Sequence, residues 1–422
     1  MGGVNPGFER LTAQYLFREV AKRRAAYETG HPADEVLSLG IGDVTRPLAP
    51  PVSAAMAAAA REMATREGFR GYPPAFGYDF LRAAIAARYA ARGVSVTPEE
   101  VYVSDGAKTD AATLAHLFGD VTVALPDPTY PVYRDAHLLA GHRLRLLPAT
   151  AENGFLPTPD GLPRTPHVVC LTSPGNPIGV AYDRAGLTEW VDFARGSGSL
   201  LVFDAAYEAV LGDTGVHSIF EIPGSRGCAV ELGSFSKSAG FTGVRCAWSI
   251  FPREVTFDGV PLAPLWERLK SMASNGVAYP VQCAAAAALT PAGLAATEKN
   301  VRYYLANARL ISRALRGAGV PYVGGEVSPY LWVRCPDGIS SWEWFDRCLV
   351  LRQVIVTPGV GFGDAGEGYV RLSALGRREI VRRAAARLFG GDTREKTQSS
   401  SLMVSYGIKM KNKRLKMTGR SR

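Results

Sequence analysis

The stretch Ser234–Arg245 constrains this chain more than any other, because it places one amine among small and hydroxylated residues. It reads Ser-Phe-Ser-Lys-Ser-Ala-Gly-Phe-Thr-Gly-Val-Arg, so that serines precede Lys237, glycines follow it, and a guanidinium closes the stretch. These residue types suit a loop that wraps a phosphate group while it presents an amine to an aldehyde. The alternative is a solvated lysine in a loop rich in serine and glycine.

An apolar run that ends in an acid lies upstream of this stretch. Residues 200–203, Leu-Leu-Val-Phe, are continuously apolar, which predicts a buried parallel strand that ends at Asp204. Ligands of open α/β sheets bind at the carboxyl ends of strands, and a pyridoxal ring needs a carboxylate to keep its nitrogen protonated. The two features together predict a pyridoxal phosphate site with Lys237 and Asp204, although a strand-end turn or helix cap also uses aspartate.

Hydrophobic patterns predict an α/β protein, in which strands and helices alternate most clearly in the last third. Strands are expected at 36–39, 101–103, 121–125, 168–172, 200–203, 330–334, 354–357 and 369–373. Helices are expected at 13–28, 52–66, 79–91, 107–118, 265–271, 284–289, 298–318, 342–351 and 378–388. The stretch 234–245 is expected to be a loop.

Three motifs together resemble one family. They are the lysine stretch at 234–245, Asp-Ala-Ala-Tyr at 204–207 and Ser-Pro-x-Asn-Pro-x-Gly at 173–179. From about Asn5 to about Gly390 the chain is similar to the class I/II aminotransferases of fold type I, and most narrowly to the LL-diaminopimelate aminotransferases. This resemblance implies a large domain with a mixed, mostly parallel sheet flanked by helices, and a smaller α/β domain.

The expected domain boundaries follow from this comparison. Residues 1–44 would form an N-terminal arm and part of the small domain, 45–290 the large cofactor-binding domain, and 291–391 the small domain. Residues 392–422 are expected to be a basic, disordered tail. From Lys396 onward the chain has basic residues and no acid, and the net charge of +9 is concentrated there. The rest is nearly neutral, which argues against a nucleic-acid partner.

The composition indicates where in the cell the protein is located. No long apolar run occurs, and Met1–Arg10 lacks the apolar core of a secretory signal, which argues against a membrane span and against export. We therefore expect a cytoplasmic protein. The six cysteines include no Cys-x-x-Cys pair, so we expect reduced thiols and no metal site.

Helix starts and strand ends supply candidate cofactor contacts. The first N–H groups of the helix at 107–118 can bind phosphate, and Lys108 adds a positive charge that can also reach a substrate carboxylate. Tyr130, held between two prolines, can stack on a ring or cap an apolar loop. Asn176 and Tyr207 can bond a phenolic oxygen. With the residues that the resemblance adds, the cofactor-binding candidates are Tyr72, Ala107, Lys108, Tyr130, Asn176, Asp204, Tyr207, Ser234, Ser236, Lys237, Arg245 and Asn275.

Candidate substrate contacts centre on Arg371, which has apolar neighbours in the expected strand 369–373, where a charge needs a partner. That partner is either the α-carboxylate of an amino acid or a buried acidic side chain. With the resemblance, the substrate-binding candidates are Tyr15, Gly42, Lys108, Tyr130, Asn176, Asn275 and Arg371. The resemblance places Tyr15, Tyr72 and Asn275 near a subunit boundary, which implies a homodimer.

The resemblance implies transamination between two small molecules, LL-2,6-diaminopimelate and 2-oxoglutarate. The products would be tetrahydrodipicolinate and glutamate, in lysine and cell-wall precursor synthesis, with Lys237 as the catalytic residue. Ala75 departs from the family, which carries an acid there that would bind the far amino group of the substrate.

An aspartate or aromatic aminotransferase or a β-lyase stays possible, because the cofactor residues do not distinguish reactions. A non-catalytic regulator would need a DNA-binding module, for which the chain has no spare segment.

Overall fold

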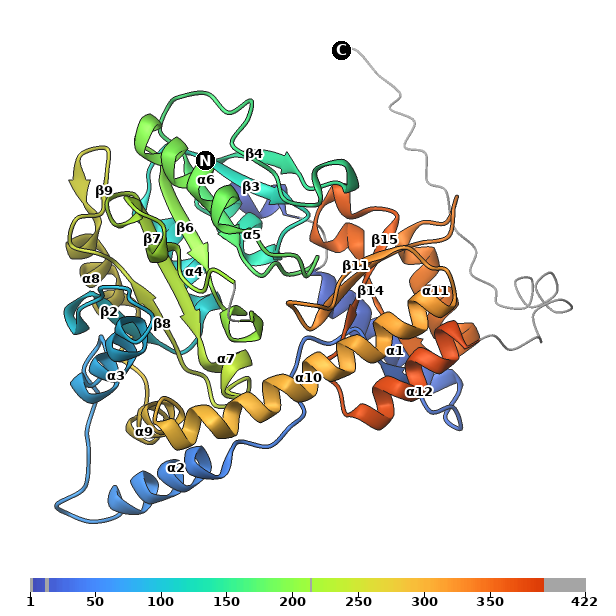
Figure 1. Cartoon of the computed structure of the whole chain (residues 1–422), viewed down its shortest axis with the longest axis horizontal. Coiled ribbons are helices and arrows are strands. Elements are labelled where there is room, and N and C mark those ends of the chain that lie inside the picture. Colours follow the sequence, from blue (N-terminus) through green and yellow to red (C-terminus); the bar gives the residue numbers. More distant parts are fainter. Residues whose placement is uncertain (1–2, 12–14, 213–214, 391–422) are drawn as a thin grey trace, which may run out of the picture.

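The structure is a computed structural model that describes residues 3–11, 15–212 and 215–390 (Figure 1). Its larger sheet has seven strands in the order β2-β8-β7-β6-β5-β3-β4. Among them β8 runs antiparallel to both of its neighbours, and the other pairs are parallel. The strands are β2 (Val101–Ser104), β3 (Thr122–Asp127), β4 (Arg143–Pro148), β5 (Val168–Thr172), β6 (Leu200–Asp204), β7 (Ala229–Ser234) and β8 (Ala247–Ile250).

Helices cover both faces of this sheet. In β6, Leu200 and Val202 pack with α4, α5 and α8 on one face, whereas Leu201 and Phe203 pack with α6 on the other. Because both faces are buried, the central strands are continuous apolar runs. The helices around the sheet are α3 (Asp79–Ala90), α4 (Ala107–Leu114), α5 (Pro131–Leu139), α6 (Arg184–Ser197), the single turn α7 (Phe235–Ser238) and α8 (Leu262–Ala273).

A second sheet lies in the last third of the chain. It is antiparallel, in the order β11-β12-β15-β14, and the arm strand β1 pairs in parallel with β13 beside it. The N-terminal helix α1 shares one hydrophobic core with this region. The elements are α1 (Leu16–Gly30), β1 (Leu37–Ser38), β11 (Tyr322–Gly324), β12 (Tyr330–Arg334), α11 (Ser341–Arg352), β13 (Val354–Ile355), β14 (Thr357–Pro358), β15 (Tyr369–Ser373) and α12 (Arg378–Phe389).

The long helix α10 (Pro291–Gly317) connects the two parts (Figure 1). It lies beside α2 (Pro50–Glu62) and α9 (Tyr279–Ala288) near its start and against α12 further along. The expected boundary at 290 falls between α9 and α10, and the domain division stays a prediction. The basic tail lies outside the described residues. None of the described helices has the length and apolar character that a membrane crossing requires.

Several expected elements were wrong in detail. Helix α10 begins at Pro291 rather than at 298, because Thr290 accepts a bond from the N–H of Gly293 and Pro291 starts the first turn. The expected strand 354–357 is two short strands, since β13 pairs with β1 and β14 with β15. Residues 235–238 form a helical turn instead of a loop. The sequence also missed β4, β7, β8, β11 and the hairpin of β9 (Thr256–Phe257) and β10 (Val260–Pro261).

Candidate active site

A cavity of about 560 Å³ opens where β5, β6 and β7 end. Side chains from α1, α4, α5, β15 and the segment after β1 complete its wall. Most of the predicted site residues line this cavity: Gly42, Ala107, Lys108, Tyr130, Asn176, Asp204, Tyr207, Ser234, Ser236, Lys237, Arg245 and Arg371. The cavity therefore lies at the strand ends, where the sequence predicted that a ligand binds.

Lys237 lies on α7, the turn that follows β7. Ser234 caps this turn, because its hydroxyl accepts a bond from the backbone N–H of Ser236 at 3.1 Å. The Lys237 ammonium donates to the carbonyl oxygen of Gly42. Burial lowers the pKa of Lys237 to about 8, although Asp43 opposes the shift. The amine is therefore close to losing its proton near neutral pH, which is the state that attacks an aldehyde.

Asp204 is a buried carboxylate at the end of β6. It accepts a hydrogen bond from the hydroxyl of Tyr133 at 2.7 Å and another from the N–H of Ala206 at 2.9 Å. Burial raises the pKa of Asp204, and these two bonds oppose that shift. No lysine, arginine or histidine within the described ranges forms an ion pair with it. A protonated ring nitrogen would be the cation that this carboxylate lacks.

A cationic corner of the cavity lies at the start of α4, beside Lys108 and Arg245. No side chain caps this helix, and the N–H groups of Thr109 and Asp110 bond the carbonyl of Gly106, so the N–H groups of Ala107 and Lys108 stay available. Arg245 reaches the same corner, with Nη1 3.4 Å from the hydroxyl of Ser236 and 3.1 Å from the carbonyl of Thr242. A side chain at Gly106 would collide with Arg245, since its Cβ would lie 2.2 Å from Nη2. The residues fit a dianion.

Arg371 is 1% exposed and forms no ion pair with any acid in the described part of the chain. Its Nη1 donates to Oδ1 of Asn176 at 2.7 Å and its Nη2 to the carbonyl of Gly40 at 2.9 Å, while Nε has no hydrogen-bond partner. Three aromatic rings surround the guanidinium. The buried acidic partner considered from the sequence is thus absent among the described residues, and a substrate carboxylate would supply the missing charge.

Two tyrosines that the sequence did not single out support these groups. The hydroxyl of Tyr330 lies 2.7 Å from that of Tyr207, and its ring lies 4.5 Å below the guanidinium of Arg371. Tyr133 bonds Asp204, as described above. The place of Tyr330 depends on the pairing of β12 with β15, which no local sequence signal reveals. Tyr133 lies one turn beyond Tyr130 on α5, and that spacing is the only available sequence signal.

Three predicted residues do not line the cavity. Tyr72 is 88% exposed, and Asn275 is exposed in the loop after α8. Their two loops touch, since a Cβ on Gly276 would lie 2.6 Å from the carbonyl of Pro74. Tyr15 lies beside the cavity and accepts a bond from Lys108 at 3.0 Å in its own chain. The roles that the resemblance gives to these residues at a subunit boundary stay predictions.

Comparison with known proteins decides the family. Residues 34–388 match the family described as "Aminotransferase class I and II". The chain belongs to the class I and II aminotransferases. This confirms the predicted family and the predicted α/β fold, whose mixed sheet and second, smaller sheet the structure contains. Aminotransferases of this class generally depend on pyridoxal phosphate, and the residues that line the cavity fit that cofactor.

Individual relatives narrow the comparison within the aminotransferases. LL-diaminopimelate aminotransferases of Agathobacter rectalis and of Bacteroides fragilis strain YCH46 are each 42% identical to this chain. The first alignment covers 91% of this chain and 98% of the relative, and the second covers 92% and 100%. The solved L,L-diaminopimelate aminotransferase from Chlamydomonas reinhardtii has a TM-score of 0.87 and 38% identity, over 92% of this chain and 98% of that one.

Proposed function

We propose that this aminotransferase interconverts LL-2,6-diaminopimelate and 2-oxoglutarate with tetrahydrodipicolinate and glutamate, as a cytoplasmic, pyridoxal 5'-phosphate-dependent homodimer. The reaction belongs to lysine and cell-wall precursor synthesis. Relatives named LL-diaminopimelate aminotransferase align with nearly the whole chain, which supports diaminopimelate as one substrate. The observation that carries the chemistry is the convergence of Lys237, Asp204 and Arg371 on one cavity.

The cavity offers a complementary group for each part of the cofactor. Arg245 and the start of α4 would hold the phosphate, and Asp204 would keep a proton on the ring nitrogen. Asn176 uses its Oδ1 on Arg371, which leaves its amide N–H groups free to donate to the phenolic oxygen. The bound cofactor supplies an electron sink for the negative charge that develops at the substrate's α-carbon.

The chain's own residues then divide the work. Lys237 would hold the aldehyde carbon until the substrate amine replaces it. The Nζ of Lys237 would also act as the base that takes the proton from the substrate's α-carbon. Arg371 would bind the α-carboxylate and so orient the α-hydrogen toward Lys237. After water releases the first oxo acid, the same residues would act in reverse on a second oxo acid, which takes up the amino group in ping-pong order.

A direct assay tests the proposed substrates. Purified protein loaded with pyridoxal 5'-phosphate would be mixed with LL-diaminopimelate and 2-oxoglutarate, and glutamate and the cyclised product would be measured together. We expect both to form at equal rates. Turnover of aspartate or of aromatic amino acids with no diaminopimelate turnover would refute the proposal, and this outcome is a real alternative because Ala75 replaces the family's acid.

Substitution of Arg371 by lysine is expected to raise KM for the amino-acid substrate by about 10- to 100-fold, with a smaller change in kcat. Lysine keeps the charge but loses the planar pair of N–H donors that a carboxylate binds. Steady-state kinetics with varied amino donor would measure the change. Arg334→Lys is the control, since Arg334 lies on the neighbouring strand β12 and its side chain is exposed; equal effects in the two variants would contradict the role of Arg371.

Substitution of Tyr330 by phenylalanine is expected to distinguish the role of its hydroxyl from the role of its ring. The ring below Arg371 stays, so KM should change little, whereas the hydroxyl that bonds Tyr207 is lost. Because Tyr207 would donate to the phenolic oxygen, the pH midpoint of the cofactor's absorbance should move by a few tenths of a unit up to about one. Tyr330→Leu should move the midpoint and raise KM together. An unchanged midpoint in both variants would show that Tyr330 only fills space.

A further inference from the structure

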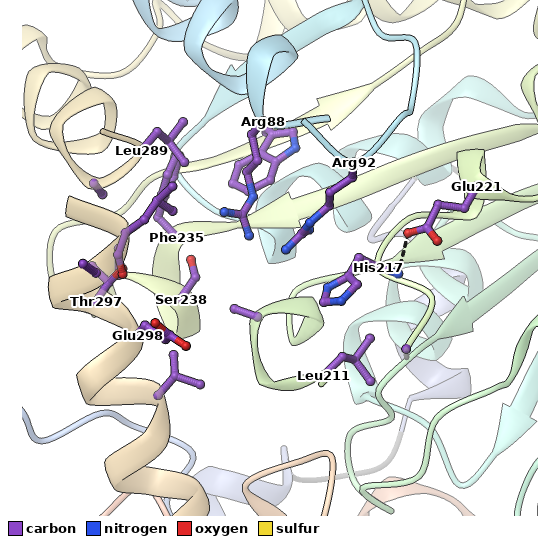
Figure 2. Close-up of a pocket in the computed structure, with 18 residues that line it drawn as sticks. Arg88, Arg92, Leu211, His217, Glu221, Phe235, Ser238, Leu289, Thr297 and Glu298 are labelled. Atoms are coloured by element: carbon purple, nitrogen blue, oxygen red, sulfur yellow. Dashed lines mark hydrogen bonds between the residues drawn. The ribbon is translucent and has the colours of Figure 1, made fainter. Parts of the chain in front are cut away.

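A second cavity, of about 660 Å³, is lined by residues on the other side of α7 from the candidate active site. Figure 2 shows the residues that line this second cavity. Figure 2 shows Arg88 and Arg92 reaching from the end of α3 into the space between α10 and the segment that carries His217. Thr297 and Glu298 project from α10 on the opposite side. The volume is in the range of small-molecule sites.

The cavity has one apolar wall and one cationic wall. The apolar wall consists of side chains from α7, β8, the end of α9 and α10, namely Phe235, Trp248, Ala288, Leu289, Leu294 and Val301. Arg88 and Arg92 stand four residues apart near the C-terminal end of α3 and therefore project from the same face, with His217 beside them. A few convergent polar groups against an apolar surface are typical of a site for a small organic molecule.

The cationic wall already binds one carboxylate, and its positive charge is larger than the negative charge of that carboxylate. The buried side chain of Glu208 accepts bonds from Arg88, from Arg92 at 2.8 Å and from His217 at 3.1 Å. Burial opposes ionisation of Glu208, but Arg88, His217 and Arg92 hold its pKa well below the usual range. Two guanidinium groups thus share one carboxylate, which leaves a positive charge facing the cavity.

The other acids of the lining do not neutralise this charge. Glu221 bonds Arg184 at 3.1 Å, and Glu298 bonds Arg302. Arg88 and Arg92 each donate through one nitrogen to Glu208, and neither has a buried N–H without a partner. Their remaining N–H groups are thus accessible from the cavity and can bind a second anion.

The turn α7 separates this cavity from the candidate active site. Phe235 and Ser238 line the second cavity, whereas Ser236 and Lys237 line the first. A molecule bound against Phe235 and Ser238 would therefore contact the turn that positions the Lys237 amine. Since α7 is a single turn of four residues, we expect a shift at one face to displace the other.

We propose that the second cavity binds a small organic carboxylate, and that this binding changes the environment of Lys237 through α7. The carboxylate would bond Arg88 and Arg92, and the apolar body would cover Leu289 and Leu294. A ligand of this kind would adjust amino transfer without occupying the substrate site.

Calorimetric titration of the cofactor-loaded protein with benzoate tests the binding site. We expect saturable binding that becomes at least about tenfold weaker in Arg92→Gln, which removes one charged donor pair. Leu294→Trp should also weaken benzoate binding, because the larger ring would fill the space beside the apolar wall of the cavity. Leu294 is partly exposed, so the protein can accept the larger side chain. Arg82→Gln is the control, since Arg82 is an arginine of α3 that does not line the cavity. Benzoate held at Arg371 instead would survive Arg92→Gln and Leu294→Trp, and that result would overturn the proposed site.

The coupling to Lys237 has its own measurement. Saturating benzoate should shift the pH midpoint of the cofactor's absorbance in the wild-type protein and in Arg82→Gln, but not in Arg92→Gln. If benzoate binds at the second cavity but the pH midpoint of the cofactor's absorbance does not change, the proposed coupling is wrong and the proposed binding site still holds. Because the titration needs no turnover, its outcome is independent of the proposed substrates.

Discussion

Replacement of Lys237 by alanine is expected to abolish amino transfer, with a fall in kcat of at least about 10⁴-fold, and to remove the absorbance band of the lysine-bound cofactor. The variant loses both the amine that holds the aldehyde and the base that moves the proton. Lys237 forms no ion pair in the described structure, and burial lowers its pKa, so its removal should leave the folded state intact. Half-reaction kinetics and absorbance spectra would measure both losses.

A second buried lysine provides the control for this experiment. Lys270 lies in α8 and pairs with the buried carboxylate of Asp110 at 3.0 Å. Lys270→Met should lower the free energy of unfolding by about 3 kcal/mol, because it leaves Asp110 buried without its cation, but it should keep the absorbance band. Borohydride reduction followed by peptide mapping should label Lys237. A label on any other lysine would disprove the catalytic assignment.

The sequence predicted strands in which apolar residues predominate, but it missed strand β7, whose polar residues have long-range roles. Strands β5, β6 and β15 were found almost to the residue. Strand β7 was missed because Glu231 and Gly233 interrupt it. Glu231 is buried and bonded by Tyr89 at 2.6 Å and by Ser218 at 2.7 Å, and burial raises its pKa to about 7. Gly233 leaves room for the indole of Trp248, which a Cβ would approach to 2.1 Å.

The candidate site also contains some groups that the sequence could predict and others that it could not. Groups at strand ends and helix starts, such as Asp204 and Lys108, could be predicted because the parallel topology brings those positions to one edge of the sheet. Tyr133 and Tyr330 could not, since their roles depend on which distant side chain they meet. The second cavity was also unpredictable, because Arg88, Glu208 and His217 look like ordinary surface charges until α3 packs against the segment after β6.

Replacement of Asp204 by asparagine is the second change for which we expect a large effect, a fall in kcat of about 10²- to 10³-fold. Asparagine keeps the shape of the side chain but cannot hold a positive charge on the ring nitrogen, so the electron sink weakens. Tyr133→Phe is the matched control, because it removes the 2.7 Å bond to Asp204 and leaves the charge. Its kcat should fall much less; equal losses would show that the bond, and not the charge, matters.

The same variant should affect stability differently with and without cofactor. In the cofactor-free protein, burial raises the pKa of Asp204 above its unfolded value, so the folded state binds the proton more tightly than the unfolded state. Stability from this group is present at low pH and is lost as pH rises through the folded pKa. At neutral pH Asp204→Asn should therefore raise the Tm of the cofactor-free protein or leave it unchanged.

With cofactor bound, the ring cation would stabilise Asp204, and the variant should lose part of the Tm gain that the cofactor gives. Thermal unfolding of both forms would decide, and a lower Tm of the cofactor-free variant would mean that Asp204 is paired within the protein itself.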